Sequence, residues 1–265
     1  MKTQNVKEFV TLLNDRLEKD SIAVLTGAGL STASGVPDFR GKNGLYTKDD
    51  SVEYKLSRRY FLDSPAEFYE FFTNNMLLQG IEPNLAHYMI SDLEKEGYLT
   101  KVITQNIDGL DRLAGTKNIV EAHGNAQRFR CDVCKTEYSM EDYLNAKDIP
   151  PVCNHQFSTG KVCNGIIRPD IVLYDEMLDY NNIISIKEGI QRAKTLLILG
   201  TGLSVYPICD FVAEYLNEAH LRKNGHMAFI INMGMTKFDL REEVLKYDGD
   251  IIEFTKEFNS VRSRK

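Results

Sequence analysis

The side chain best suited to move a proton is that of His123, which stands beside Gly124 at the end of a short apolar run. An unperturbed imidazole has a pKa of about 6.5, so it can accept a proton at neutral pH. A single histidine is more often structural than catalytic. The residue alone therefore leaves both interpretations open.

Three polar residues, Gln105, Asn106 and Asp108, follow the apolar run that ends at Thr104. Such residues are common in turns, where they satisfy backbone groups. Acting together, they could instead hold a ribose and an amide. These residues alone do not decide between the two hypotheses.

A glycine-rich stretch, TGAGLS at 26–31, follows an earlier apolar run. Glycines there allow a tight turn and a close approach of the backbone to a pyrophosphate. The Gly-x-Gly-x-x-Gly pattern is incomplete because residue 32 is Thr, so a plain strand-to-helix turn stays open. The next loop, bounded by Gly and Pro, brings together Asp38, Phe39 and Arg40. Its aromatic ring and guanidinium could cover a nucleotide, with the guanidinium on phosphate, or the loop could be a surface turn with an Asp–Arg pair.

Four of the five cysteines fall within residues 127–166. Cys131 and Cys134 have the spacing of a metal knuckle, whereas nine residues separate Cys153 from Cys163. A tetrahedral zinc site needs thiolates that converge in space, not a fixed spacing. His155 is an alternative to Cys153 as a ligand, and Cys209 is expected to be a buried apolar residue.

Short apolar runs alternate with helical patterns along most of the chain. The runs predict buried parallel strands at Ile22–Leu25, Lys101–Thr104, Thr195–Leu199 and Ala228–Ile231, with a fifth at Asp250–Glu253. Helices are predicted over residues 3–19, Leu85–Lys95 and Cys209–Leu221. This alternation predicts an α/β fold with a Rossmann-like parallel sheet. In such sheets ligands bind beyond the carboxyl ends of the strands, which is where the polar residues above lie.

Two segments break the alternation. Residues 45–83 are rich in aromatics and are predicted to be a helical insertion, with Pro65 near a helix start. Residues 127–166 have too few apolar runs to fold unaided and are predicted to be a metal module. We expect these two segments to form a small domain, and residues 1–44, 84–126 and 167–265 to form the Rossmann-like domain.

Composition excludes several classes of function. The chain has 265 residues and a formal net charge of −6, so non-specific nucleic-acid binding is not expected. No apolar run is long enough to span a membrane. The N-terminus lacks the pattern of a signal peptide, which favours the cytoplasm and makes metal binding likelier than a disulfide framework.

Five blocks in order resemble those of the sirtuin family, and their pattern is that of a prokaryotic-type minimal member. GAGLSTASGVPDFRG at 27–41 resembles the family's NAD-binding signature. The other blocks are TQNIDGL at 104–110, EAHG at 121–124, GTGLSVYP at 200–207, and Ile231-Asn232. Together they span nearly the whole chain. The resemblance implies an NAD-dependent protein lysine deacylase.

The resemblance also implies roles for individual residues. His123 would be the catalytic base, and Asn106 would position the ribose or a water. NAD would be bound by Gly27, Ala28, Gly29, Ser31, Thr32, Asp38, Phe39, Arg40, Gln105, Asn106, Ile107, Asp108, His123, Gly200, Thr201, Gly202, Asn232 and Asp250. A structural zinc would be held by Cys131, Cys134, Cys153 and Cys163. The partner would be an acyl-lysine protein or peptide, whose acyl group passes to ADP-ribose as nicotinamide leaves.

The chain departs from the family pattern at three places. Tyr174-Asp175 stands where members more often have Phe-Gly, in a segment that pairs with the substrate peptide. Gly202 stands where Ser is frequent, which removes a hydroxyl contact to NAD, and Asp111 stands where many members have His. Residues 68–75 contain no Arg that could meet an acyl carboxylate, so an uncharged acyl group is expected.

Three other functions would use similar residues. A mono-ADP-ribosyltransferase would use the same NAD site, and the fate of an acyl-lysine substrate would discriminate it. A non-catalytic NAD- or ADP-ribose-binding module is disfavoured because His123 and Asn106 are both present. A nicotinamide dehydrogenase would require a complete glycine pattern with an acidic residue about 20 positions further on.

Overall fold

The computed structural model describes residues 2–3, 5–37, 44 and 51–263. The predicted NAD contacts Asp38, Phe39 and Arg40 lie outside these described residues. Every prediction that concerns them stays a prediction.

The larger part of the molecule is built on a seven-stranded sheet in the order β1-β10-β9-β8-β2-β3-β4. All of its strand pairs are parallel. The strands are β1 (Lys2–Thr3), β2 (Ile22–Thr26), β3 (Leu99–Thr104), β4 (Ile119–Glu121), β8 (Thr195–Leu199), β9 (Met227–Ile231) and β10 (Val244–Tyr247). At the centre, Val24 of β2 pairs with Val102 and Leu197. Strands this apolar must be covered on both faces, because alternate side chains point to opposite sides.

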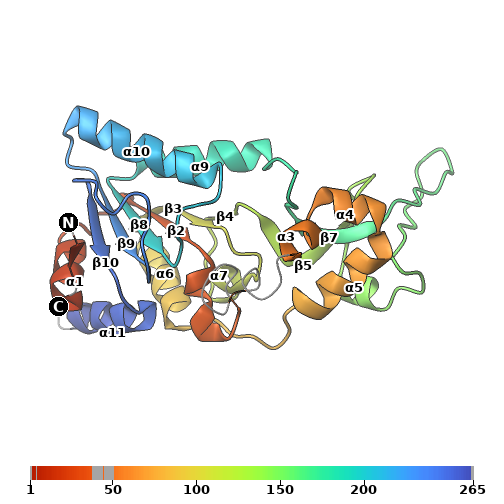
Figure 1. Cartoon of the computed structure of the whole chain (residues 1–265), viewed down its shortest axis with the longest axis horizontal. Helices are drawn as coiled ribbons and strands as arrows, with labels where there is room; N and C mark the ends of the chain where they lie inside the picture. The colour runs from red at the N-terminus through yellow and green to blue at the C-terminus, as the bar shows by residue number, and fades with distance from the viewer. Residues whose placement is uncertain (1, 4, 38–43, 45–50, 264–265) are drawn as a thin grey trace.

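Helices cover both faces of this sheet (Figure 1). One apolar cluster joins Val24 and Leu197 to helices α1 (Val6–Asn14), α6 (Leu85–Lys95) and α11 (Ile251–Arg262). A second joins Leu25 and Ile198 to α9 (Tyr180–Arg192) and α10 (Ile208–Arg222). The predicted Rossmann-like α/β fold is therefore confirmed. Short helices follow the ends of β2 and β3, namely η1 (Ala28–Leu30), η2 (Thr32–Ser34) and α7 (Leu110–Leu113).

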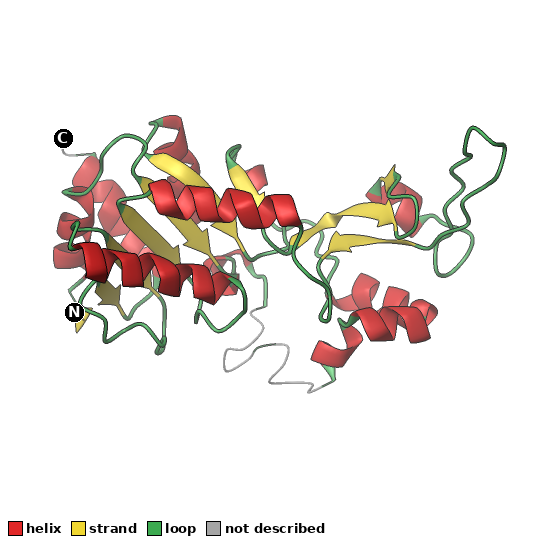
Figure 2. Cartoon of the chain, turned by 90° about the horizontal axis from the view of Figure 1, so that it is seen from above, coloured by secondary structure: helices red, strands yellow, loops and turns green. Residues whose placement is uncertain are grey.

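A smaller unit lies at the far end of the molecule (Figures 1 and 2). It holds a three-stranded sheet of β6 (Glu137–Tyr138), β5 (Gly124–Cys131) and β7 (Ile167–Ile171). Around it lie α3 (Val52–Lys55), α4 (Arg58–Asp63), α5 (Pro65–Asn75) and α8 (Met140–Leu144). Its own apolar cluster includes Phe61, Phe68 and Phe72 from the helices, with Phe129 and Cys131 from β5. The residues predicted to be a helical insertion thus form α3 to α5, and Pro65 is the first residue of α5.

Two predicted elements differ from the structure. Asp250–Glu253 is not a strand: Asp250 caps α11, and its carboxylate accepts from the backbone N–H of Glu253 at 2.8 Å. Asp followed three residues later by Glu is a helix-start pattern, and the two isoleucines between them fit a helix as well as a strand. The first helix is shorter than predicted, because Asn5 caps its start and it ends at Asn14.

Candidate active site and metal centre

A cavity of about 840 Å³ opens where β2, β3, β8 and β9 end. The motif residues that line it come from five separate loops, those after β2, β3, β4, β8 and β9: Gly27, Ala28, Gly29, Gln105, Asn106, Ile107, His123, Gly200, Thr201, Gly202 and Asn232. Such a meeting of strand ends is where open α/β sheets bind ligands. Sequence blocks far apart in the chain therefore share one site.

Four predicted NAD contacts lie away from this lining. Ser31 is fully buried behind it, and Asp108 lines a small adjoining cavity. Thr32 is exposed, and its hydroxyl donates to the carbonyl oxygen of Gly29 at 3.0 Å. Asp250 is exposed and caps α11.

Two glycine loops form the wall of the cavity next to β2 and β8. The N–H of Gly29 donates to the carbonyl oxygen of Gly200 at 2.8 Å. A Cβ on Gly29 would lie 2.8 Å from the Cα of Gly200, and one on Gly27 would lie 2.6 Å from the Cβ of Thr201. Gly200 has φ of +67°, a conformation that favours glycine. Only glycine permits this contact, which leaves a cradle of backbone groups at the cavity.

His123 is held in one ring orientation. Its Nδ1 lies 2.9 Å from the carbonyl oxygen of Gln105. A carbonyl oxygen can only accept, so Nδ1 donates and Nε2 carries no proton in the neutral ring. The backbone of His123 is fixed as well, because its carbonyl oxygen accepts from Val172 at 2.9 Å. The half-buried ring therefore presents a proton acceptor at the cavity.

Asn106 belongs to a buried polar network. It is 6% exposed, and its amide donates to the carbonyl oxygen of Gly27 and to the hydroxyl of Ser31, both at 3.1 Å. The Ser31 hydroxyl in turn donates to Asp108 at 2.7 Å. Burial raises the pKa of Asp108, although hydrogen bonds from Leu110 and Ser31 oppose that effect. The network orients Asn106 relative to the glycine cradle.

Two residues around this network were named in the sequence but were not predicted to belong to the site. His87, which we interpreted as structural, lies with Nε2 3.4 Å from the Ser31 hydroxyl, and burial lowers its pKa to about 4. Asp111 is 2% exposed, and burial, with the charge of Asp108, raises its pKa to about 7. A His on a capping pattern and an Asp in a short helix carry no distinctive signal.

Segments outside the glycine loops form the remaining wall of the cavity. Apolar side chains there come from the small unit and from the residues after β7: Leu56, Met76, Ile171, Leu173 and Met177. The sequence indicated only the segment 171–176, through its resemblance to a peptide-pairing stretch. The rest became visible only when the chain was folded.

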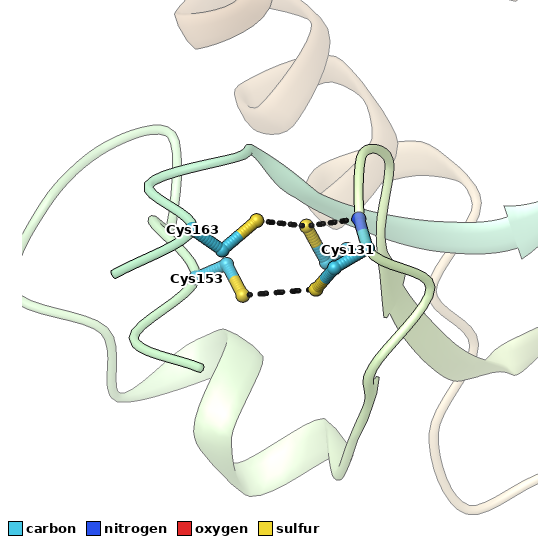
Figure 3. Close-up of side chains that lie close together, drawn as sticks. Cys131, Cys153 and Cys163 are labelled. Atoms are coloured by element: carbon cyan, nitrogen blue, oxygen red, sulfur yellow. Dashed lines mark hydrogen bonds between the residues drawn. The ribbon is translucent and has the colours of Figure 1, made fainter. Parts of the chain in front are cut away.

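The four predicted cysteines meet in the small unit (Figure 3). Sulfur–sulfur distances are 3.7 Å for Cys131–Cys163 and 3.6 Å for Cys134–Cys153. These distances are too long for a disulfide. A tetrahedron of thiolates with zinc–sulfur bonds of about 2.3 Å has edges of about 3.8 Å, so the set fits zinc. Cys153, not His155, belongs to this group.

Hydrogen bonds surround the cysteine sulfurs. Backbone N–H groups of Val133 and Cys134 donate to Cys131 at 3.4 and 3.5 Å. The hydroxyl of Tyr138 donates to Cys153 at 3.0 Å. Such donors orient thiolates and offset their negative charge. The four thiolates leave no open coordination position, so the centre is structural.

Comparisons with known proteins agree with this geometry. The model of the Sir2 family matches residues 27–207. An NAD-dependent protein deacetylase of Thermotoga maritima is 38% identical over 259 residues, covering 95% of this chain and 96% of the relative. A solved Sir2 with deacetylated p53 peptide and 3'-O-acetyl ADP-ribose has a TM-score of 0.82 and 35% identity, covering 97% of this chain and 98% of its own. A Sir2 with p53 peptide and NAD has a TM-score of 0.81 and 34% identity, covering 98% and 100%. The family match spans more than half of the chain, and the resemblance seen in the sequence is confirmed: this chain belongs to the Sir2 family, the sirtuins.

Proposed function

We infer that this protein is an NAD-dependent protein lysine deacylase, which transfers the acyl group of an acyl-lysine to ADP-ribose with release of nicotinamide. The observation that carries the inference is the placement of His123. Its ring lines the cavity in which the glycine loops and the segment after β7 meet, and the bond from Nδ1 to the carbonyl oxygen of Gln105 leaves Nε2 as the unprotonated nitrogen of the neutral ring. A relative is named an NAD-dependent protein deacetylase, and solved Sir2 neighbours contain NAD with a peptide, an acetylated peptide, or a deacetylated peptide with 3'-O-acetyl ADP-ribose.

The glycine cradle suits the pyrophosphate of NAD. A Cβ at Gly27 or Gly29 would collide with Gly200 or Thr201, so the backbone is open to a ligand only with glycine at these positions. We propose that Gln105, Asn106 and Thr201 hold the ribose on the nicotinamide side and that Asn232 holds the ribose on the adenine side. Ser31 and Asp108 support Asn106 from behind. We propose that Thr32 and Asp250 act by positioning the backbone at the starts of η2 and α11.

His123 is proposed to be the base. NAD supplies the ADP-ribosyl group that receives the acyl group as nicotinamide leaves. Nε2 of His123 takes the proton of a ribose hydroxyl, while the carbonyl oxygen of Gln105 stabilises the imidazolium through Nδ1. The chain contributes orientation and proton transfer, with no covalent bond to the protein.

The substrate is proposed to be an acyl-lysine peptide with an uncharged acyl group. The cavity lining includes the apolar side chains of Leu56, Met76, Ile107 and Ile171. An acyl carboxylate would lose its hydration against them without a cationic partner. Acetyl is proposed as the preferred group, and longer fatty acyl groups suit the same apolar lining.

Other expectations remain proposals. We propose that residues 45–83 and 127–166 form the small domain, with zinc as its structural metal. No nucleic-acid partner is proposed. Within the part of the chain that the structure describes, no helix combines the length and apolarity needed to cross a membrane. A cytoplasmic location remains a prediction from sequence.

The test is a mass-spectrometric time course of an acetyl-lysine peptide with the zinc-loaded protein, with and without NAD. We expect NAD-dependent loss of acetyl with one O-acetyl-ADP-ribose formed per lysine released. His123→Ala should lower kcat by about 10²- to 10⁴-fold, the usual contribution of a general base. His155→Ala, at an exposed histidine outside the cavity lining, is the matched control and should retain full activity.

Two outcomes would overturn the proposal. Consumption of NAD with ADP-ribose appearing on protein, while the peptide stays acylated, would identify an ADP-ribosyltransferase. Binding of NAD with no turnover on acetyl, butyryl or longer acyl peptides would identify a binding module.

A further inference from the structure

Four charged side chains from three separate segments meet beside the cavity: Arg58, Asp132, Arg168 and Glu176. We call them the charged cluster. Arg58 is the first residue of α4, and Arg168 lies in β7. Asp132 stands between Cys131 and Cys134, inside the metal knuckle. Glu176 ends the segment 171–176, which lines the cavity.

Charges alternate in the cluster, and each arginine forms a two-pronged pair with one acid. Arg58 donates from Nη1 and Nη2 to the two oxygens of Asp132, both at 2.8 Å. Arg168 donates to the two oxygens of Glu176 at 2.6 and 2.9 Å. The cross contacts are 3.5 Å from Arg58 to Glu176 and 3.6 Å from Arg168 to Asp132. Paired forks of this kind fix geometry as well as charge.

The cluster is largely shielded from water. Arg168 is 1% exposed, and the side chains of Asp132 and Glu176 are 18% and 21% exposed. The bond from Arg58 lowers the pKa of Asp132 despite burial. Burial alone would raise the pKa of Glu176, but the bond and charge of Arg168, the N–H of Leu173 and the charge of Arg58 together lower it. Both acids therefore stay ionised, and the loss of one partner would leave a buried charge uncompensated.

Direct bonds run from the cluster to the backbone of segment 171–176. Arg168 donates to the carbonyl oxygen of Ile171 at 2.7 Å, and Glu176 accepts from the N–H of Leu173 at 2.9 Å. Separately from its charged side chain, the backbone N–H of Arg58 donates to the carbonyl oxygen of Tyr174 at 2.9 Å. The cluster thus sets the shape of the segment, and the backbone at the start of α4 holds it from the other side.

Asp175 shows that this shape needs support. Its φ is +69°, a left-handed conformation that disfavours residues with a Cβ and costs roughly 1–2 kcal/mol. Glycine, frequent here in the family, would adopt it without that cost. Such a conformation persists only where neighbouring contacts enforce it. The next residue, Glu176, supplies those contacts through Arg168 and Leu173.

We propose that the charged cluster is a positioning device that links metal occupancy of the four-cysteine site to affinity for the acyl-lysine peptide. Metal fixes the knuckle that carries Asp132, Asp132 fixes Arg58, and Arg58 with Arg168 holds segment 171–176 in its peptide-pairing shape. The proposal rests on the proposed function, because it concerns the peptide side of that site. None of the four residues touches the cavity's glycine loops through a bond described above, so NAD should be bound independently of the cluster.

The first test compares two adjacent arginines of α4. Arg58→Gln should raise the Kd for an acetyl-lysine peptide by about tenfold, as expected for the loss of hydrogen bonds to a charged partner. Its KM for NAD and its kcat should change by less than about twofold, because sites without shared partners act independently. Arg59→Gln is the matched control: its only ion pair among the described residues, with Asp63, is exposed, and such pairs contribute little.

The second test measures the linkage without turnover. Zinc affinity is determined by competition with a chromophoric chelator, with and without saturating acetyl-lysine peptide. Linkage is reciprocal, so peptide should tighten zinc binding by the factor by which zinc tightens peptide binding. That factor should be well above one in the unaltered protein and in Arg59→Gln, and about tenfold smaller in Arg58→Gln, in step with its weaker peptide binding. A merely structural role for Arg58 would weaken zinc binding equally with and without peptide.

The outcomes separate this proposal from the function on which it rests. If the unaltered protein neither binds nor deacylates the peptide, the proposed function fails. If it deacylates the peptide but its zinc affinity is the same with and without peptide, only the proposed linkage is wrong. If Arg58→Gln does not fold, Asp132→Asn replaces it in these measurements, because it removes the charge of the same pair and keeps the side-chain shape. Normal peptide affinity in Asp132→Asn with one zinc per chain would overturn the linkage too.

Discussion

The two parts of this molecule are stabilised in different ways. The seven-stranded sheet has an apolar cluster on each face, and helices complete both. The small unit has a single apolar cluster, which includes the metal-site residues Cys131 and Cys153, and it adds the charged cluster. The part built on the seven-stranded sheet provides the glycine cradle. The small unit provides the apolar wall and segment 171–176. We therefore expect the proposed peptide half of the site to depend on metal and charge, and the proposed nucleotide half, formed by the glycine loops, to depend on packing.

Removal of the metal should have the largest effect on activity and should destabilise only the small unit. Equal destabilisation of both parts would contradict the difference described above. Structural zinc sites contribute about 10–16 kcal/mol of binding free energy, which is also folding free energy. Chelation or Cys153→Ala should abolish deacylation. In hydrogen–deuterium exchange, β5, β7 and α5 should lose protection while β2, β3, β8 and β9 keep theirs.

Cys209→Ala is the matched control for that experiment. Cys209 is buried in α10 and stands apart from the four-cysteine group. The variant should keep one zinc per chain and lose only about 1 kcal/mol of stability, as expected for a small cavity. A loss of zinc in this variant, or equal loss of protection in both parts after chelation, would contradict the division.

Gly200→Ala should instead disrupt the nucleotide half of the site, which the glycine loops form. A Cβ there would lie 2.3 Å from the backbone nitrogen of Leu30, and φ of +67° adds strain. Backbone atoms on both sides cannot yield as a flexible side chain does. We expect NAD affinity to fall by more than about tenfold, with the left-handed penalty of roughly 1–2 kcal/mol as its minimum cause. Calorimetry would measure NAD affinity, and an unchanged zinc content would show that the small unit is intact.

The sequence predicted the seven-stranded sheet and its glycine loops better than it predicted the small unit. Apolar runs at β2, β3, β8 and β9 are buried on both faces, so burial, strand type and the glycine turns agree. β10 was missed because Lys246 interrupts its apolar run; the lysine is buried there in an ion pair with Asp239. The fifth strand was wrongly placed on the start of α11, where a two-isoleucine run suits either structure.

The peptide half could be predicted only in part. Four cysteines indicated a metal site because thiolates have few other uses in such a pattern. The charged cluster carried no comparable signal, since Arg58 and Asp132 are 74 positions apart and each is an ordinary surface type. The strained Asp175 was seen as a departure from the family, but its physical meaning needed its backbone angle.

Asp111, in the larger part, and the two acids of the charged cluster should respond to pH in opposite directions. Asp132 and Glu176 have lowered pKa values, so their stabilisation is present at neutral pH and is lost in acid. The pKa of Asp111 is raised to about 7, so folding favours its protonated form. Its stabilisation is complete below the unfolded pKa of about 3.9 and is lost by at most about 1.4 kcal/mol per pH unit as pH rises to about 7.

Asp111→Asn should remove this dependence. The variant should gain stability relative to the unaltered protein as pH rises from 4 to 7, to at most about 4 kcal/mol, and the gain should level off above 7. Urea unfolding at several pH values measures it. Asp92→Asn, at an exposed aspartate of α6, should give no such trend. A gain that is constant with pH would show that Asp111 stays ionised when buried.

His87 gives stability a pH dependence opposite to that from Asp111 over part of that pH range. Its pKa is lowered to about 4, so folding favours the neutral ring. The resulting stabilisation is present above about pH 6.5 and is lost as pH falls toward 4. The two slopes partly cancel between pH 4 and 6.5. The gain from Asp111→Asn should therefore be accompanied by a steeper rise of the variant's own stability with pH in that interval.

The smallest effect should come from Gly202→Ser, which sharpens the comparison within the nucleotide half itself. A Cβ on Gly202 meets no described atom within 4 Å, and its φ is not left-handed. The position therefore tolerates a side chain that Gly200, two residues earlier, does not. Serine restores the hydroxyl that many sirtuins have here, and one added neutral hydrogen bond is worth about 1 kcal/mol. The KM for NAD should fall by up to about fivefold, with peptide affinity unchanged. An increase in KM would mean that the glycine is required by the bound nucleotide and not by the fold.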